Sequence, residues 1–64
     1  MTFRNAKKLH NEDEVTVKET GEVVRVLSTI TKGPNDGLRR PTVFIETVSK
    51  DTNHWDEYMH TEVK

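Results

Sequence analysis

Three histidines, His10, His54 and His60, are the side chains in this sequence best suited to bind a metal ion or to transfer a proton. Their spacing matches no compact ligand motif. On a strand, His54 and His60 would share a face but lie about 20 Å apart, because a strand rises about 3.3 Å per residue. We therefore expect histidines at the surface or at the rim of the core, no metal site and no cofactor.

The hydroxyl and carboxyl groups offer no activated pair for catalysis. Neither Ser28 nor Ser49 stands in a G-x-S-x-G turn, and there is no cysteine. Acids cluster at residues 12–14 and at 56–57, but a chain this short has little interior in which to desolvate a carboxylate pair for general acid–base chemistry. We interpret these acids as solvated strand ends, and we expect the protein not to be an enzyme.

Basic side chains gather in two stretches, residues 1–11 and the turn-rich 32–41. They could neutralise phosphates while Phe44, Trp55 or Tyr58 stacks on a base. Against this, the net charge is −1, and the acidic strip from 12 to 22 would repel a phosphate backbone. Binding of RNA or DNA is the second of two alternatives, and its candidate contacts are Arg4, Lys7, Lys8 and Lys32.

Binding of a protein partner is the favoured alternative. A domain of about 60 residues buries only about 60% of its unfolded surface, so some apolar side chains are expected to stay exposed. The loop 32–41 contains two glycines and two prolines, and long loops often carry function. The candidate partner contacts are Leu38, Arg39, Arg40 and Tyr58. An adaptor, an assembly subunit, or a small regulator of the phage or plasmid type would use such a surface, and a homodimer stays open.

Length and composition indicate how many domains the chain forms and in which compartment it is expected. The chain has 64 residues, of which 31% are hydrophobic and 33% charged, so it forms one small domain. Without cysteine there is no disulfide, which leans toward the cytoplasm. No apolar run approaches the roughly 20 residues of a membrane span. The first ten residues lack the apolar segment of a secretory signal, and a start at Met1 is consistent with a whole gene product.

The densest β-branched run, residues 14–30, predicts a hairpin. Gly21 supplies the positive φ that the turn needs. On the long second strand two alternating sets compete for the core. We expect the inner set to be Val24, Val26, Ser28 and Ile30. Val23 and Leu27 would then need cover, either from a sheet that closes on itself or from a partner.

The rest of the chain predicts further strands. Residues 42–48 form a strong strand and residues 54–60 a weaker one, on which Trp55, Glu57 and Met59 share a face. We place Trp55 in the core. A tight turn at 60–62 precedes a final strand fragment at Val63. Residues 1–11 are expected to be a partly ordered basic tail anchored by Phe3 and Leu9, with a short basic helix as the alternative.

The segment DEVTVKETGEVVRV, residues 13–26, carries an alternating V-x-V strand, a glycine turn and a valine-rich strand. It resembles the opening hairpin of the KOW-type members of the small Src-homology-3-like barrels. The turn at residues 58–63 is similar to the tight helical turn before the last strand of that barrel. The resemblance implies an all-β fold, a single small β-barrel of about five strands over residues 12–64, preceded by the basic N-terminal tail 1–11.

Overall fold

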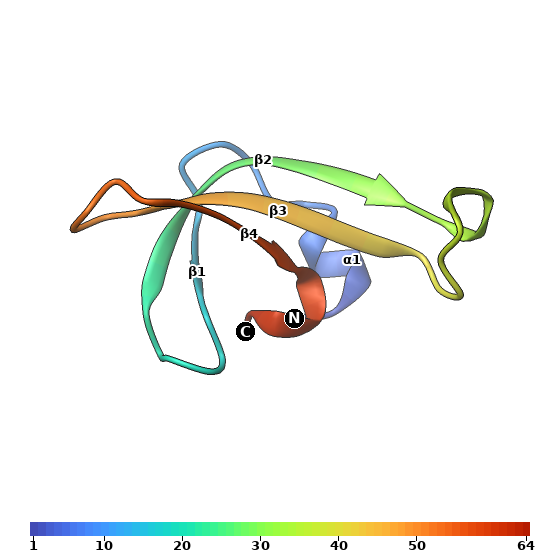
Figure 1. Cartoon of the computed structure of the whole chain (residues 1–64), viewed down its shortest axis with the longest axis horizontal. Coiled ribbons are helices and arrows are strands. Elements are labelled where there is room, and N and C mark those ends of the chain that lie inside the picture. The colour runs from blue at the N-terminus through green and yellow to red at the C-terminus, as the bar shows by residue number, and fades with distance from the viewer.

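A computed structural model describes residues 1–64 as one curved antiparallel sheet with two short helical segments on one side and a third in the loop beyond its end (Figure 1). The four strands lie in chain order, so every connection is a hairpin. The strands are β1 (Glu14–Thr16), β2 (Val23–Lys32), β3 (Thr42–Ser49) and β4 (Trp55–Met59). The helical segments are α1 (Phe3–Ala6) and the 3₁₀ turns η1 (Pro34–Asp36) and η2 (His60–Glu62). The expectation of an all-β fold is confirmed.

The β1–β2 hairpin forms where the valine pattern predicts it. Val15 pairs with Val24 across the ladder, and both side chains are buried. Gly21 has φ +74°, a conformation that costs an L-residue with a Cβ about 1–2 kcal/mol. The prediction that Gly21 supplies the positive φ of this turn is therefore confirmed.

A β-bulge interrupts β2 at Leu27. Val26 pairs with Thr47 on β3, but the next pair is Ser28 with Glu46, so Leu27 is the extra residue. Because side chains alternate between faces, one extra residue moves every later side chain to the other face. Val24 and Val26 point into the core as expected, but Ile30 is 47% exposed. The prediction of Ser28 and Ile30 on the inner face is therefore wrong.

The core lies under the inner face of the sheet and consists almost entirely of small β-branched side chains. The N-terminal segment, expected as a partly ordered tail with a short helix as the alternative, forms the short helix α1, and Ala6 is fully buried. Thr2 caps this helix through its Oγ1, which accepts from the Asn5 N–H at 3.2 Å. The buried core cluster comprises Ala6, Val15, Val17, Val24, Val26, Val43, Ile45 and Val63. The division of the chain into a basic tail, 1–11, and a domain, 12–64, stays a prediction.

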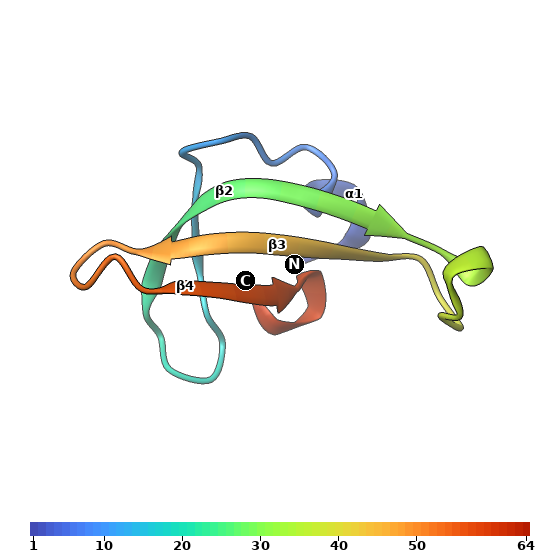
Figure 2. The ribbon, with the colours of Figure 1, turned by 45° about the horizontal axis from the view of Figure 1, so that its top comes forward.

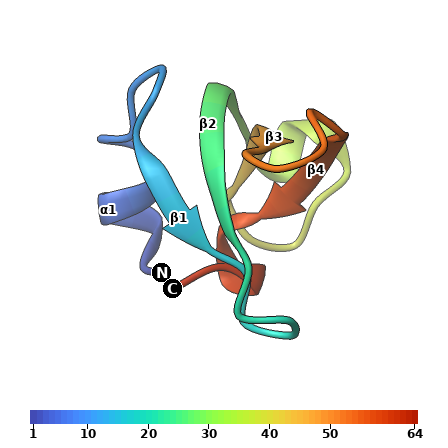
Figure 3. The same cartoon turned by 90° about the vertical axis from the view of Figure 1, so that its left-hand side faces the viewer.

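The sheet does not close into a barrel of five strands. After β4 the chain turns through η2, and only Val63 then pairs with Val17, in a single bridge. Two backbone bonds flank the bridge, from the Lys18 N–H to the Glu62 carbonyl and from the Lys64 N–H to the Thr16 carbonyl, both at 2.9 Å. The tight turn expected at 60–62 is present as η2, but the strand fragment expected at Val63 forms no more than this single bridge, so no fifth strand closes the sheet. Figure 3 shows the resulting curved, open sheet, with both chain ends beside each other.

The β2–β3 connection extends beyond the end of the sheet, away from α1 and the chain ends (Figure 1). Within it, η1 is capped by Asp36, whose carboxylate accepts from the Gly33 N–H at 3.0 Å. Gly37 follows with φ +86° and ends the turn. This loop is therefore locally structured, as its Asn-Asp-Gly sequence favours. None of the helices is long and apolar enough to cross a membrane.

Candidate functional site

The outer face of β2, β3 and β4, opposite α1, carries a row of apolar side chains. Residues directly opposite each other on neighbouring strands project from the same face. Ile30 pairs with Phe44, and Phe44 pairs with Met59. Ile30 is 47% and Met59 40% exposed, while Phe44 is half-buried. We call Ile30, Phe44 and Met59 the apolar row.

Lys32 borders the apolar row at the end of β2. Its Nζ lies 5.3 Å from the centroid of the Phe44 ring, a cation–π contact. Lys32 therefore belongs to the outer face, where it adds a positive charge beside an aromatic ring.

Trp55 lies on the outer face, at the far end of the sheet from Lys32. It pairs with Val48, which in turn pairs with Arg25. The Trp55 side chain is 68% exposed, so its expected place in the core is wrong. Alternation is the reason: Asp56 and Tyr58 occupy the inward positions of β4, which leaves Trp55, Glu57 and Met59 on the outer face, as their shared face predicted.

A polar row separates the apolar row from Trp55. Ser28 pairs with Glu46 and Glu46 with Glu57 across the three strands. The Ser28 hydroxyl donates to Glu46 Oε2 at 3.2 Å. Neither glutamate forms an ion pair with a lysine or an arginine; the three ion pairs in the molecule are His10–Asp13, Lys50–Glu14 and His54–Asp56. The outer face thus alternates between apolar and acidic side chains.

Figure 2 shows β2, β3 and β4 side by side, with α1 behind them and β4 at the margin of the sheet. The strand order leaves β4 paired with β3 alone. The other margin, at β1, is partly covered by the Val17–Val63 bridge. Strand β4 therefore presents a free backbone edge along its whole length.

The structure separates the predicted partner contacts. Arg39 and Arg40 are exposed and Leu38 is half-buried, in the loop that continues from the Lys32 end of the outer face. Tyr58 instead packs against the core cluster from the inner face. It pairs with Ile45, about 10 Å along β3 from the start of that strand.

The environment of Tyr58 changes its titration. Burial raises the pKa of the Tyr58 hydroxyl above its ordinary value of 10.0, and nearby negative charges raise it further. Those charges belong to Asp56, Glu22, Glu62 and Glu19. The Tyr58 hydroxyl is therefore held neutral to higher pH than a free tyrosine.

The basic residues of the N-terminal segment form a second surface. Arg4, Lys7 and Lys8 line an open pocket together with Phe3. The Lys7 Nζ lies 5.3 Å from the centroid of the Phe3 ring. Helix α1 contacts β3 and η2, so this pocket and Lys32, on the outer face, are not brought together.

The three histidines also lie apart, each with its own partner. His10 faces Asp13 at 3.9 Å and His54 faces Asp56 at 3.8 Å. His60 is half-buried, and its Nδ1 accepts from the Val43 N–H at 3.2 Å. No group of three or more histidine, cysteine or carboxylate side chains is arranged to hold a metal ion.

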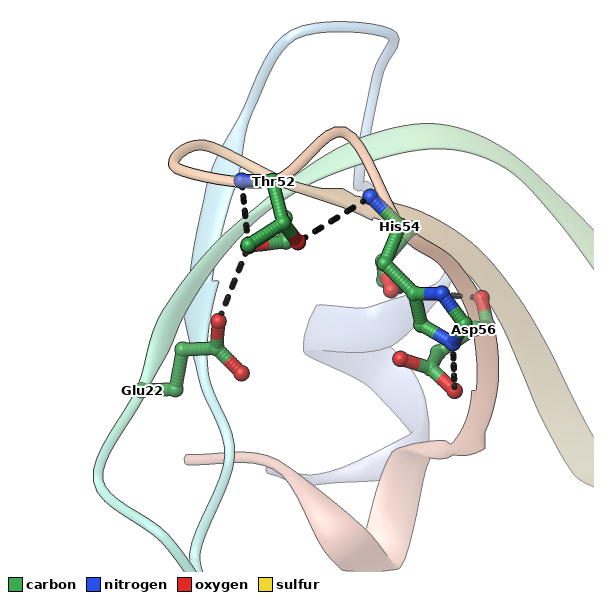
Figure 4. A network of polar contacts seen from close by, with 6 residues as sticks. Glu22, Thr52, His54 and Asp56 are labelled. Carbon is green, nitrogen blue, oxygen red and sulfur yellow. Dashed lines mark hydrogen bonds and ion pairs between the residues drawn. The ribbon is translucent and has the colours of Figure 1, made fainter.

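A serine, a histidine and an aspartate, Ser49, His54 and Asp56, lie around the β3–β4 turn. Figure 4 shows Glu22, Thr52, His54 and Asp56 of the polar network there. The Ser49 hydroxyl donates to Glu22 Oε2 at 3.0 Å. The Ser49 backbone, not its hydroxyl, meets the His54 backbone, and the His54 ring pairs with Asp56. A nucleophile would need the histidine ring as its base. The chemical effect of this network is instead to fix the turn and to tie it to the β1–β2 hairpin.

The sequence reasoning did not select the apolar row. The available signal was the apolar content of β2 on both faces, which was assigned to Val23 and Leu27. Val23 is 42% exposed and Leu27 half-buried, but the continuous apolar row begins at Ile30, beyond the bulge. A bulge leaves no clear mark in a single β-branched run, so the reversal of faces was not foreseen.

No protein-family model, no curated protein and no solved structure matches this chain. The KOW-type resemblance therefore stays a prediction.

Proposed function

We propose that this protein is a non-enzymatic binding module whose main partner is another protein. The observation that supports this most strongly is the apolar row, in which Ile30 and Met59 expose 47% and 40% of their surface beside Phe44. Adjacent exposed apolar side chains on one face are typical of interaction surfaces. Methionine and aromatic residues are also enriched where proteins meet.

The loop arginines extend this proposed surface. Arg39 and Arg40 are exposed just beyond the Lys32 end of the apolar row, where they would contribute polar contacts at the rim. Replacing both with alanine is expected to weaken partner binding and to leave the fold intact. Loss of folding in that variant would instead assign the pair a structural role.

The test is capture of partners from a lysate of the source cell on immobilised wild-type protein, with and without nuclease. The informative variant is Ile30→Thr, and the matched control is Val23→Thr, at a β-branched residue of similar exposure on the same strand. We expect the captured proteins to resist nuclease, to be lost with Ile30→Thr and to be retained with Val23→Thr. Equal capture by all three proteins would contradict the proposal.

Nucleic-acid binding is the second candidate, supported by the pocket that Arg4, Lys7 and Lys8 line with Phe3. Three cations beside an aromatic ring suit phosphate neutralisation and base stacking. Fluorescence anisotropy with RNA and DNA oligonucleotides at low salt tests it, since the electrostatic term is strongest there. Binding that is lost with Lys8→Gln but kept with Lys18→Gln would support this candidate.

The chain order also supports a relation to the small Src-homology-3-like barrels, in an open form. The hairpins, the 3₁₀ turn η2 and the Val17–Val63 bridge follow one another as the strands and the last turn of such a barrel do. This relation, a cytoplasmic location and a homodimer are likewise proposed, and fold alone assigns no partner.

A further inference from the structure

The free edge of β4 has a regular pattern of backbone groups. In an antiparallel ladder, residues alternate between pairs that exchange hydrogen bonds and pairs that do not. The Ser49 N–H donates to the His54 carbonyl at 2.9 Å, so counting along the register makes Thr47–Asp56 and Ile45–Tyr58 the bonded pairs. The N–H and C=O groups of Trp55, Glu57 and Met59 therefore point away from β3.

One of these outward groups already has a partner. The Met59 N–H donates to Glu62 Oε1 at 3.0 Å, which agrees with the alternation and closes that end of the edge. Trp55 and Glu57 keep their outward backbone groups. Of these two residues, Glu57 lies in the middle of β4, so a strand added to the edge would be centred on it.

The side chains of the same residues define what would fit beside them. Trp55, Glu57 and Met59 alternate apolar, acidic, apolar on the outer face, and Trp55 is 68% exposed. Directly opposite residues on paired strands place their side chains together. A residue opposite Glu57 would thus exchange two backbone hydrogen bonds with it and set its side chain beside the Glu57 carboxylate, which forms no ion pair in this structure.

A second copy of the chain fits this edge poorly. Strand β4 contains Asp56 and Glu57 and no basic residue, and Glu46 lies beside Glu57 on β3. Pairing two copies through β4 would bring these acids together, and like charges directly opposite each other destabilise a sheet. A positively charged strand would instead gain an ion pair at its centre.

We propose that β4 binds an extended, basic segment of a partner protein as an added antiparallel strand, with a lysine or arginine opposite Glu57 and apolar residues two positions to either side. This inference rests on the proposed protein-binding function and names the chemistry of the partner. The flanking apolar residues would contact Trp55 and Met59, of which Met59 belongs to the apolar row.

The probe is a blocked synthetic peptide, Thr-Val-Thr-Lys-Thr-Ile-Thr, whose valine, lysine and isoleucine alternate on one face. Trp55 is the single tryptophan of the chain, so its fluorescence reports contact at the edge directly. Two matched peptides serve as controls, one with glutamate in place of lysine and one with the lysine amide N-methylated. Each is titrated against the wild type and against Glu57→Lys.

We expect the lysine peptide to shift Trp55 emission to the blue, and the glutamate peptide to bind about tenfold more weakly, as replacing an attractive cross-strand pair by a repulsive one implies. N-methylation should weaken binding similarly, and Glu57→Lys should reverse the preference between the charged peptides. No binding of the lysine peptide, equal binding of all three, or a wild-type dimer dissociated by Glu57→Lys would overturn the proposal.

The two proposals fail in different ways. If lysate capture depends on Ile30 while the peptide titration is negative, the protein-binding function stands and the edge proposal falls. If capture does not depend on Ile30 but the lysine peptide binds as expected, the apolar row is not the contact surface and the edge is.

Discussion

The Nδ1 atom of His60 accepts a hydrogen bond from the backbone N–H of Val43 at 3.2 Å. This contact joins η2 to the start of β3, and the His60 ring also meets the Phe3 ring edge-on, with 5.8 Å between centroids. His60 therefore links β3, η2 and α1 at the end of the sheet where no fifth strand closes the structure. Only an unprotonated Nδ1 can accept this bond.

Replacing His60 by alanine should lower the free energy of unfolding by about 1–3 kcal/mol, because the Val43 N–H loses its partner. His60→Asn should recover part of the loss, since an asparagine Oδ1 can accept in the place of Nδ1. The control is His54→Ala, whose exposed ring pairs only with Asp56. Urea denaturation measures all three variants, and equal stability of His60→Ala and His54→Ala would contradict this role.

Tyr58 should make the protein less stable at alkaline pH. Its pKa is raised in the folded state by burial and by surrounding acids, so its contribution is fully present below the unfolded pKa of about 10. That contribution is lost as the pH rises from there through the folded pKa, because the unfolded chain releases the proton first.

The measurement for Tyr58 is the free energy of unfolding of wild type and Tyr58→Phe from about pH 8 to pH 11. The difference between the two proteins removes the shared titration of the lysines. We expect it to be constant below about pH 10 and to change in favour of Tyr58→Phe above it. Parallel curves throughout would show that the hydroxyl titrates alike in both states.

Gly21→Ala should destabilise the β1–β2 hairpin by about 1–2 kcal/mol, the cost of a left-handed conformation for a residue with a Cβ. No atom lies within 4 Å of where that Cβ would be, so the cost is one of backbone conformation and not of collision. Gly33→Ala is the matched control, with equally open surroundings and an extended φ of −131°. Thermal unfolding should rank Gly21→Ala below Gly33→Ala, and the reverse order would contradict the turn assignment.

Trp55→Ala should change stability by no more than about 1 kcal/mol, because most of the side chain is already in water. Val26→Ala, which removes a fully buried side chain from β2, should cost more despite its smaller volume. Chemical denaturation of the two variants measures this contrast. A loss of several kcal/mol with Trp55→Ala would return Trp55 to the core.

The sequence predicted where the strands lie better than it predicted which way their side chains face. The valine runs at Val15 and Val24 and the turn at Gly21 carry local signals, and the structure has both. Ile30 was assigned to the wrong face because a bulge depends on how β2 meets β3, which no local pattern records. Trp55 was predicted to lie in the core because it is large and apolar. Alternation along β4 places Tyr58, not Trp55, on the inner face.

The bulge at Leu27 gives β2 two different roles. On one side of it the strand supplies Val24 and Val26 to the interior, and on the other it presents Ile30 to the surroundings. The bulge thus divides one β-branched run into two parts. The first part contributes apolar side chains to the core, and the second places Ile30 on the solvent-exposed outer face. A strand without the bulge, in which Leu27 itself paired with Glu46, would instead turn Ile30 inward and Thr29 and Thr31 outward, and would erase the apolar row without changing a single apolar residue within it.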